Sequence, residues 1–168
     1  MMGKDNDPVQ IYRNKVRVRV SGILVENNKI LMVNHKGLSP NNMFWSPPGG
    51  GIEYSENAEK SLHREFKEET GLKVQVGHFL FVNEVILNNL HAIEIFFEVS
   101  RISGEIMTGT DPEQTPDNQI IKNVVFLSLE DIRKVPEKSI HNCFHNLRKI
   151  HEIFNIRGYS YFSGVQKK

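Results

Sequence analysis

Four glutamates and one arginine lie close together in the sequence, directly after a run of three glycines. The acids are Glu56, Glu65, Glu68 and Glu69, and the cation is Arg64. Helical residues three and four positions apart share a face, so a helix here would crowd Glu65, Glu68 and Glu69. Two like charges about 4 Å apart repel by roughly 4 kcal/mol near a protein surface. A divalent cation that neutralises the cluster is the simplest chemistry that explains it.

Helical geometry places this acidic cluster beside a buried face. At about 100° per residue, Ala58, Leu62 and Phe66 form an apolar stripe. Glu65 and Glu69 lie at the borders of that stripe, so we expect them to be partly buried. A partly buried carboxylate must be paired or bound to metal. A solvated charged face is the alternative interpretation.

The ligand types indicate which cation would bind. Carboxylates without nearby His or Cys favour Mg²⁺, Mn²⁺ or Ca²⁺ over zinc. Mg²⁺ is usually shared with substrate phosphates, so the predicted partner is a small phosphorylated molecule. Arg64 lies four residues before Glu68 and is expected to orient that carboxylate. One glutamate would then deprotonate or orient an attacking water.

The surrounding pattern predicts the elements that position these groups. Valines at 16, 18 and 20 alternate with Arg17 and Arg19, which predicts a strand over 15–25 and a hairpin to 30–33. A helix over 57–70 should begin after an Asn57 N-cap and end at Gly71. The other expected elements are strands over 72–87, 90–99 and 124–127, a short helix after the Ser128 capping box, and an amphipathic helix carrying Ile140, Cys143, Phe144, Leu147, Ile150 and Phe154.

These elements favour a single α/β or α+β domain. We expect residues 1–14 to be a loose N-terminal segment, 15–155 to be the domain and 156–168 to be a tail. The 168 residues carry a net charge of +1, which argues against a nucleic-acid partner. A single cysteine and the lack of a long apolar run predict a cytoplasmic protein without a membrane partner. A homodimer is compatible with the sequence.

At this point the pattern resembles a known family. Gly50, five residues, Glu56, seven residues and then REFKEETGL from Arg64 to Leu72 fill every fixed position of a Nudix box. A chance match is on the order of one in a million at typical residue usage. The segment Trp45-x-x-Pro48-Gly49-Gly50 is similar to the family's approach to the box.

The resemblance implies an α/β/α sandwich with a mixed β-sheet between helices. It implies a hydrolase that cleaves phosphoanhydrides of nucleoside triphosphates or other nucleoside diphosphate-linked molecules, with Mg²⁺ or Mn²⁺ as cofactor. By position, Glu65, Glu68 and Glu69 would hold the metal, with the Gly49 carbonyl as a further ligand. Glu65 would also be the catalytic base and Arg64 would orient a glutamate. Glu56 would support the loop and the helix.

One departure from the family pattern leaves the base open. Many members carry a further carboxylate before the late helix, where this chain has Gln119, and Glu113 or Asp117 are the candidates to replace it. A regulatory Nudix domain that binds nucleotide without turnover therefore stays as the alternative. An isopentenyl diphosphate isomerase needs a catalytic cysteine, and Cys143 lies far from the box.

Residues outside the Nudix box could contact the substrate and determine which substrate is bound. Subfamily markers after the box are mostly absent, which favours a general nucleoside triphosphate or another phosphorylated substrate without selecting one. The candidate substrate contacts are Arg17, Arg19, His35 and Glu94, and Phe44 or Trp45 could stack on a base. His141 and His145 have zinc-like i, i+4 spacing, but we expect two solvated helix histidines. Cys143 is expected in the core.

Overall fold

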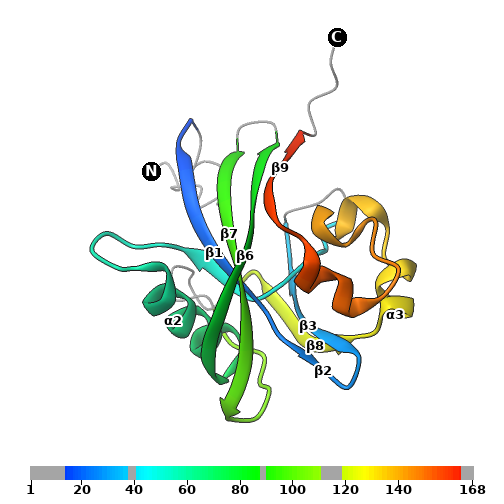
Figure 1. The fold of residues 1–168 in the computed structure, drawn as a ribbon, viewed down its shortest axis with the longest axis horizontal. Helices are drawn as coiled ribbons and strands as arrows, with labels where there is room; N and C mark the ends of the chain where they lie inside the picture. Colours follow the sequence, from blue (N-terminus) through cyan, green and yellow to red (C-terminus); the bar gives the residue numbers. More distant parts are fainter. Residues whose placement is uncertain (1–13, 38–40, 88–89, 111–118, 164–168) are drawn as a thin grey trace, which may run out of the picture.

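The computed structural model describes residues 14–37, 41–87, 90–110 and 119–163 (Figure 1). The strands are β1 (Val16–Ile23), β2 (Val25–Glu26), β3 (Lys29–His35), β4 (Phe44–Ser46), β5 (Gly49–Gly51), β6 (Lys73–Leu87), β7 (Leu90–Ser103), β8 (Ile121–Leu127) and β9 (Gly158–Ser163). The helices are α2 (Ala58–Thr70) and α3 (Leu129–Lys134), with 3₁₀ turns η2 (Glu137–Ser139), η3 (Asn142–Phe144) and η4 (Ile150–Asn155).

The strands form two sheets with mixed pairing. The five-stranded sheet has the order β5-β1-β7-β6-β9, in which β1 pairs with β7 and β6 with β9 in parallel. The other sheet is antiparallel and is centred on β3, which pairs with β2, β4 and β8. The predicted hairpin is confirmed at β2–β3, where Asn27 and Asn28 have φ of 49° and 58°. Such positive φ values are typical of a tight hairpin turn.

The sheets lie between two helical layers, and β3 shows why. Leu31 and Val33 pack into the apolar cluster beneath α2, whereas Ile30 and Met32 face a second cluster that includes Ile132 of α3. Because successive strand residues point to opposite faces, β3 is buried on both sides. Figure 1 shows α2 on one side of the strands and α3 with the 3₁₀ turns on the other. The predicted α/β/α sandwich is therefore confirmed.

The limits of α2 follow the predicted capping residues. The Asn57 side chain accepts a hydrogen bond from the Lys60 N–H at 2.8 Å, which satisfies one free donor of the first turn. Gly71 ends the helix in the left-handed conformation with φ of 74°. The predicted capping box at Ser128 and Asp131 is also present at the start of α3.

The predicted terminal amphipathic helix is wrong. Its residues form η3, η4 and connecting turns, and Lys149 between them is extended. The His141 N–H donates to the Trp45 carbonyl at 2.9 Å, so the chain pairs with β4 where a helix would close on itself. Burial of Ile140, Phe144 and Ile150 in the second cluster explains the apolar pattern without a helix.

Two further differences concern the ends of the chain. Part of the segment expected as a tail forms β9, which pairs with β6. On β1, Val16 and Val18 are 56% and 43% exposed, whereas Arg17 and Arg19 are half-buried. The valine face becomes buried only at Val20, which is 0% exposed, so the expected alternation is reversed at the start of the strand alone. Within the described ranges, every helix is too short or too polar to cross a bilayer.

Candidate active site

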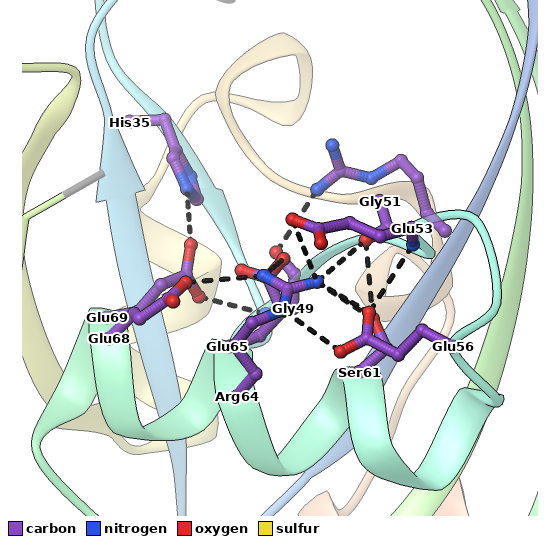
Figure 2. Close-up of polar contacts among 11 residues, drawn as sticks. His35, Gly49, Gly51, Glu53, Glu56, Ser61, Arg64, Glu65, Glu68 and Glu69 are labelled. Atoms are coloured by element: carbon purple, nitrogen blue, oxygen red, sulfur yellow. Dashed lines mark hydrogen bonds and ion pairs between the residues drawn. The ribbon is translucent and has the colours of Figure 1, made fainter. Parts of the chain in front are cut away.

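Arg64, at the middle of α2, connects most of the polar groups of the site (Figure 2). Its guanidinium binds both oxygens of Glu56, with Nε to Oε1 at 3.1 Å and Nη2 to Oε2 at 2.9 Å. Nη1 donates to Glu65 at 2.8 Å and to Glu68 at 3.3 Å, and Nη2 donates to the Gly51 carbonyl at 3.1 Å. The hydrogen bonds from Arg64 lower the pKa of Glu56. The predicted Arg64–Glu68 contact is present, and the same side chain also connects the helix to the glycine strand.

Glu65 lies directly against β5. A Cβ added at Gly50 would overlap the Glu65 carboxyl group, so only glycine leaves room for this side chain. The Glu65 side chain is 12% exposed. Burial raises its pKa to about 7, and the nearby charge of Glu69 adds to the effect. A carboxyl group with this pKa can exchange a proton near neutral pH.

Glu69 is buried and held from two sides. The Gly49 N–H donates to Oε2 at 2.9 Å, and His35 Nε2 lies 3.4 Å from Oε1. The other His35 nitrogen, Nδ1, lies 3.4 Å from the Ser46 hydroxyl. With its proton on Nε2, the ring donates to Glu69 and accepts from Ser46. The structure thus brings His35, a predicted substrate contact, to a predicted metal ligand (Figure 2).

The three glutamates could supply oxygens to a hard cation. Glu68 is the most accessible, with 29% of its side chain exposed. Burial raises the pKa of Glu65, and the charge of Glu69 raises it further, which is the part that a cation would relieve. The oxygens of these glutamates contact Arg64, His35 and the Gly49 N–H. In the described part of the chain, no three His, Cys, Asp or Glu side chains lie close enough together to form a metal site. The donor chemistry fits Mg²⁺ or Mn²⁺, with Arg64 and His35 competing for the oxygens.

Arg19 and Arg17 reach the glycine strand from β1. Arg19 Nη2 donates to the Gly49 carbonyl at 3.3 Å, which is the carbonyl predicted as a metal ligand. The Arg17 guanidinium lies beside Gly51, 3.0 Å from the position of an added Cβ. The positively charged side chains of Arg17 and Arg19 therefore lie next to the carboxylate cluster, where they would attract an anionic substrate.

Glu94 is buried in β7 and belongs to another group of contacts. His141 Nε2 lies 2.7 Å from Glu94 Oε2, and Asn83 Nδ2 donates to the same oxygen at 3.0 Å. Arg19 Nε lies 3.9 Å from Oε1. Burial raises the pKa of Glu94, but the charge and hydrogen bond of His141 outweigh it and hold the pKa well below its usual value.

The expectation that His141 is solvated is wrong. Its side chain is buried, and it caps η3 where a helix was expected. Sequence reasoning missed the His141–Glu94 pair, although a charged residue inside the apolar run of β7 signals a buried partner. His145, also expected to be solvated, is half-buried, with 17% of its side chain exposed and Nδ1 3.5 Å from Glu137.

The remaining candidates are placed as follows. Phe44 packs edge-on against His141, and Trp45 packs against the second apolar cluster. Cys143 also packs there, in agreement with the expected core position, and it is partly exposed. Glu113 and Asp117 lie outside the described residues, so their role as replacements for Gln119 stays a prediction.

Two proteins of known name are similar to part of this chain. The chain is 36% identical over 99 residues to an ADP-ribose pyrophosphatase of Methanocaldococcus jannaschii, covering 58% of each chain. It is 31% identical over 87 residues to an 8-oxo-dGTP diphosphatase of Buchnera aphidicola, covering 52% of this chain and 65% of that protein. The matches thus span less than two thirds of these relatives.

A solved structure shows the same fold. The crystal structure of a UDP-X diphosphatase superposes with a TM-score of 0.65 at 18% identity, covering 95% of this chain and 76% of that one. The NUDIX domain family model matches residues 15–145, which include α2 and the strands β1 to β8. With most of its length matched by that model, the chain belongs to the NUDIX domain family.

Proposed function

We propose that this protein hydrolyses a phosphoanhydride bond of a nucleoside triphosphate or another nucleoside diphosphate-linked molecule. The observation that carries the proposal is the position of Glu65. Its carboxyl group is enclosed by Gly50 and Arg64, and burial next to Glu69 raises its pKa to about 7. A base with a pKa near the working pH is best suited to take a proton from water.

We propose Glu65, Glu68, Glu69 and the Gly49 carbonyl as the ligands of Mg²⁺ or Mn²⁺. When bound, such a cation would neutralise carboxylate and phosphate charge. Arg19 donates to the Gly49 carbonyl and lies beside Glu94, so a cation bound at that carbonyl would have to replace this hydrogen bond.

The side chains would divide the reaction between them. Glu65 accepts a proton from the attacking water, whose oxygen bonds to phosphorus while the bridging P–O bond breaks. Arg64 keeps Glu65 and Glu68 aligned, since one guanidinium binds both. Arg17 and Arg19 would bind phosphate oxygens, and guanidinium groups suit this because they present several fixed donors. His35 would keep the Glu69 carboxylate in place.

The relatives guide the choice of substrate. One is named for ADP-ribose and the other for 8-oxo-dGTP, and both names denote cleavage of a pyrophosphate or diphosphate. We therefore place ADP-ribose and purine nucleoside triphosphates first among the substrates to test, followed by nucleotide sugars and dinucleotides.

The test is a substrate panel assayed with Mg²⁺ and with Mn²⁺, scored by release of phosphate and nucleotide. The variant Glu69→Gln removes a proposed ligand, and Glu59→Gln is the matched control because Glu59 lies on the same helix with 65% of its side chain exposed. We expect activity in the wild type and in Glu59→Gln, and a loss of at least about a hundredfold in Glu69→Gln. Equal activity in both variants would reject the metal assignment. Tight nucleotide binding without turnover would identify a regulatory domain.

A further inference from the structure

A thiol, an imidazole and a carboxylate stand in line on the side of the sheets opposite α2. Cys143 Sγ lies 3.0 Å from His141 Nδ1, and His141 Nε2 lies 2.7 Å from Glu94 Oε2. Cys143 belongs to η3, His141 is its N-cap residue, and Glu94 lies on β7. This sequence of contacts is the one that activates a cysteine nucleophile through a histidine oriented by a third polar group.

Helix capping alone does not account for this arrangement. The His141 side chain accepts a hydrogen bond from the Cys143 N–H at 3.3 Å, which a neutral ring provides through Nδ1. That cap requires neither the thiol nor the buried Glu94. Glu94 is fixed by Asn83, which in turn exchanges hydrogen bonds of 3.1 and 2.9 Å with Asn142. The carboxylate is therefore held against Nε2 by a network of its own.

Cys143 Sγ and Glu94 Oε2, which face the two ring nitrogens of His141, favour the protonated form of this ring. Burial lowers the pKa of His141, but Cys143 and Glu94 outweigh it and raise this pKa well above its usual value. Cys143 Sγ lies within hydrogen-bonding distance of Nδ1, so Nδ1 is placed to take the thiol proton as the sulfur reacts, in exchange for the cap hydrogen bond from the Cys143 N–H. Two further charged groups face this centre. Arg19 lies 3.9 Å from the second Glu94 oxygen, and Glu152, which receives the Arg148 N–H at 2.7 Å, lines the adjoining cavity.

The thiol has access to a small molecule. Cys143 is partly exposed and lines an open cavity of about 420 Å³ between β6, β9 and the 3₁₀ turns. Phe81 and Leu147 give it apolar walls, and Asn142 and Ser160 give it hydrogen-bonding groups. Small-molecule sites in proteins typically measure roughly 300–1,000 Å³ and combine these surfaces.

We propose that Cys143 is an activated thiol and a site of covalent modification by a small disulfide that enters this cavity. The Cys143 sulfur gives its proton to His141 Nδ1 and attacks one sulfur of the disulfide, so that a new S–S bond forms and the original S–S bond breaks. The leaving thiolate takes the proton from His141 Nδ1. Protein thiol and disulfide are thereby converted into a mixed disulfide and a free thiol, with no other oxidant required. This site does not depend on the proposed hydrolase function.

Because Cys143 is the only cysteine in the sequence, every thiol reaction of the protein reports on it. The probe is a chromogenic aromatic disulfide that releases a coloured thiol, and intact mass confirms the adduct. At pH 6, an ordinary cysteine with a pKa of about 8.5 is less than about 1% thiolate. We expect the folded protein to react at least about tenfold faster at pH 6 than the same chain unfolded in urea. A folded rate equal to or below the unfolded rate would overturn the proposal.

Variants test whether the fast reaction of Cys143 depends on His141 and Glu94 or only on the surrounding segment. Glu94→Gln and His141→Gln should lose the excess rate at pH 6. His145→Gln, a change in the same segment at a histidine that contacts Glu137, should keep it. Circular dichroism verifies that each variant is folded. An unchanged excess in both Glu94→Gln and His141→Gln would refute the assigned roles, and the wild-type comparison remains decisive if His141→Gln does not fold.

Discussion

The carboxyl group of Glu65 occupies the space in which a side chain at Gly50 would lie. The helix and the glycine strand can approach this closely because one partner has no Cβ. The Gly50 backbone is not in the left-handed region, so this glycine is required for space and not for its φ angle.

Gly50→Ala should therefore act on the site more than on the fold. The added methyl group must displace Glu65, and overpacking of this kind costs about 1–3 kcal/mol. We expect kcat to fall by at least about tenfold while circular dichroism shows a folded protein. Gly77→Ala is the comparison, since its Cβ would lie 3.2 Å from the Glu98 backbone oxygen, a milder clash than that of a Cβ at Gly50 and one that does not involve Glu65. Full activity of Gly50→Ala would show that the position of Glu65 is not critical.

Arg64→Lys should destabilise the protein although the charge is kept. A single ammonium group cannot bind both oxygens of Glu56 and also reach Glu65, Glu68 and the Gly51 carbonyl. We expect a loss of about 1–3 kcal/mol in urea unfolding, because buried acceptors are left unpaired. Lys134→Met removes the exposed pair with Glu130 and should cost under about 0.5 kcal/mol. Similar losses in both variants would argue against a central role for Arg64.

Mg²⁺ should stabilise the folded protein. A ligand present at about a hundredfold excess over its Kd stabilises the native state by about 2.7 kcal/mol. We expect Tm to rise with Mg²⁺, to return to its starting value with a chelator, and not to respond in Glu69→Gln. Glu59→Gln should respond as the wild type does. A cation response that persists in Glu69→Gln would place the ion elsewhere.

Acid should weaken the protein through Glu94. Its pKa is lowered in the folded state, so its contribution to stability is present above the usual glutamate pKa of 4.5 and is lost as the pH falls toward the lower folded value. We expect the free energy of unfolding to drop more steeply below pH 4.5 in the wild type than in Glu94→Gln, by on the order of 1–2 kcal/mol. Urea unfolding between pH 3 and 7 measures this. Parallel curves for the two proteins would contradict the assignment.

The sequence predicts the local features of this protein best. The limits of α2 follow from Asn57 and Gly71, and the burial of Glu69 follows from its position beside the apolar stripe. These features depend on residues close together in the chain, so periodicity and capping rules determine them.

Contacts between distant residues were missed. The pairing of His141 with Glu94 joins residues 47 positions apart, and pairing of the His141 backbone with β4 replaces the predicted helix. The sequence shows that valines and arginines alternate along β1. At the start of this strand, however, Val16 and Val18 are exposed, whereas Arg17 and Arg19 are half-buried. Arg19 lies beside Glu94 of the neighbouring strand, whereas Val20 on the valine face packs beneath α2, and one strand's pattern cannot report such distant partners.

Burial of β3 on both faces has a consequence for how the strand finds its place. A slip of one residue would exchange Ile30 and Met32 with Leu31 and Val33, and the apolar content of each face would hardly change. Hydrophobic patterning, which usually specifies strand alignment, is therefore nearly degenerate here. The strand's polar end distinguishes the two alignments, because only one of them brings His35 to Ser46 and Glu69. The contacts of His35 with Ser46 and Glu69 thus distinguish the native register of β3 from one shifted by a single residue.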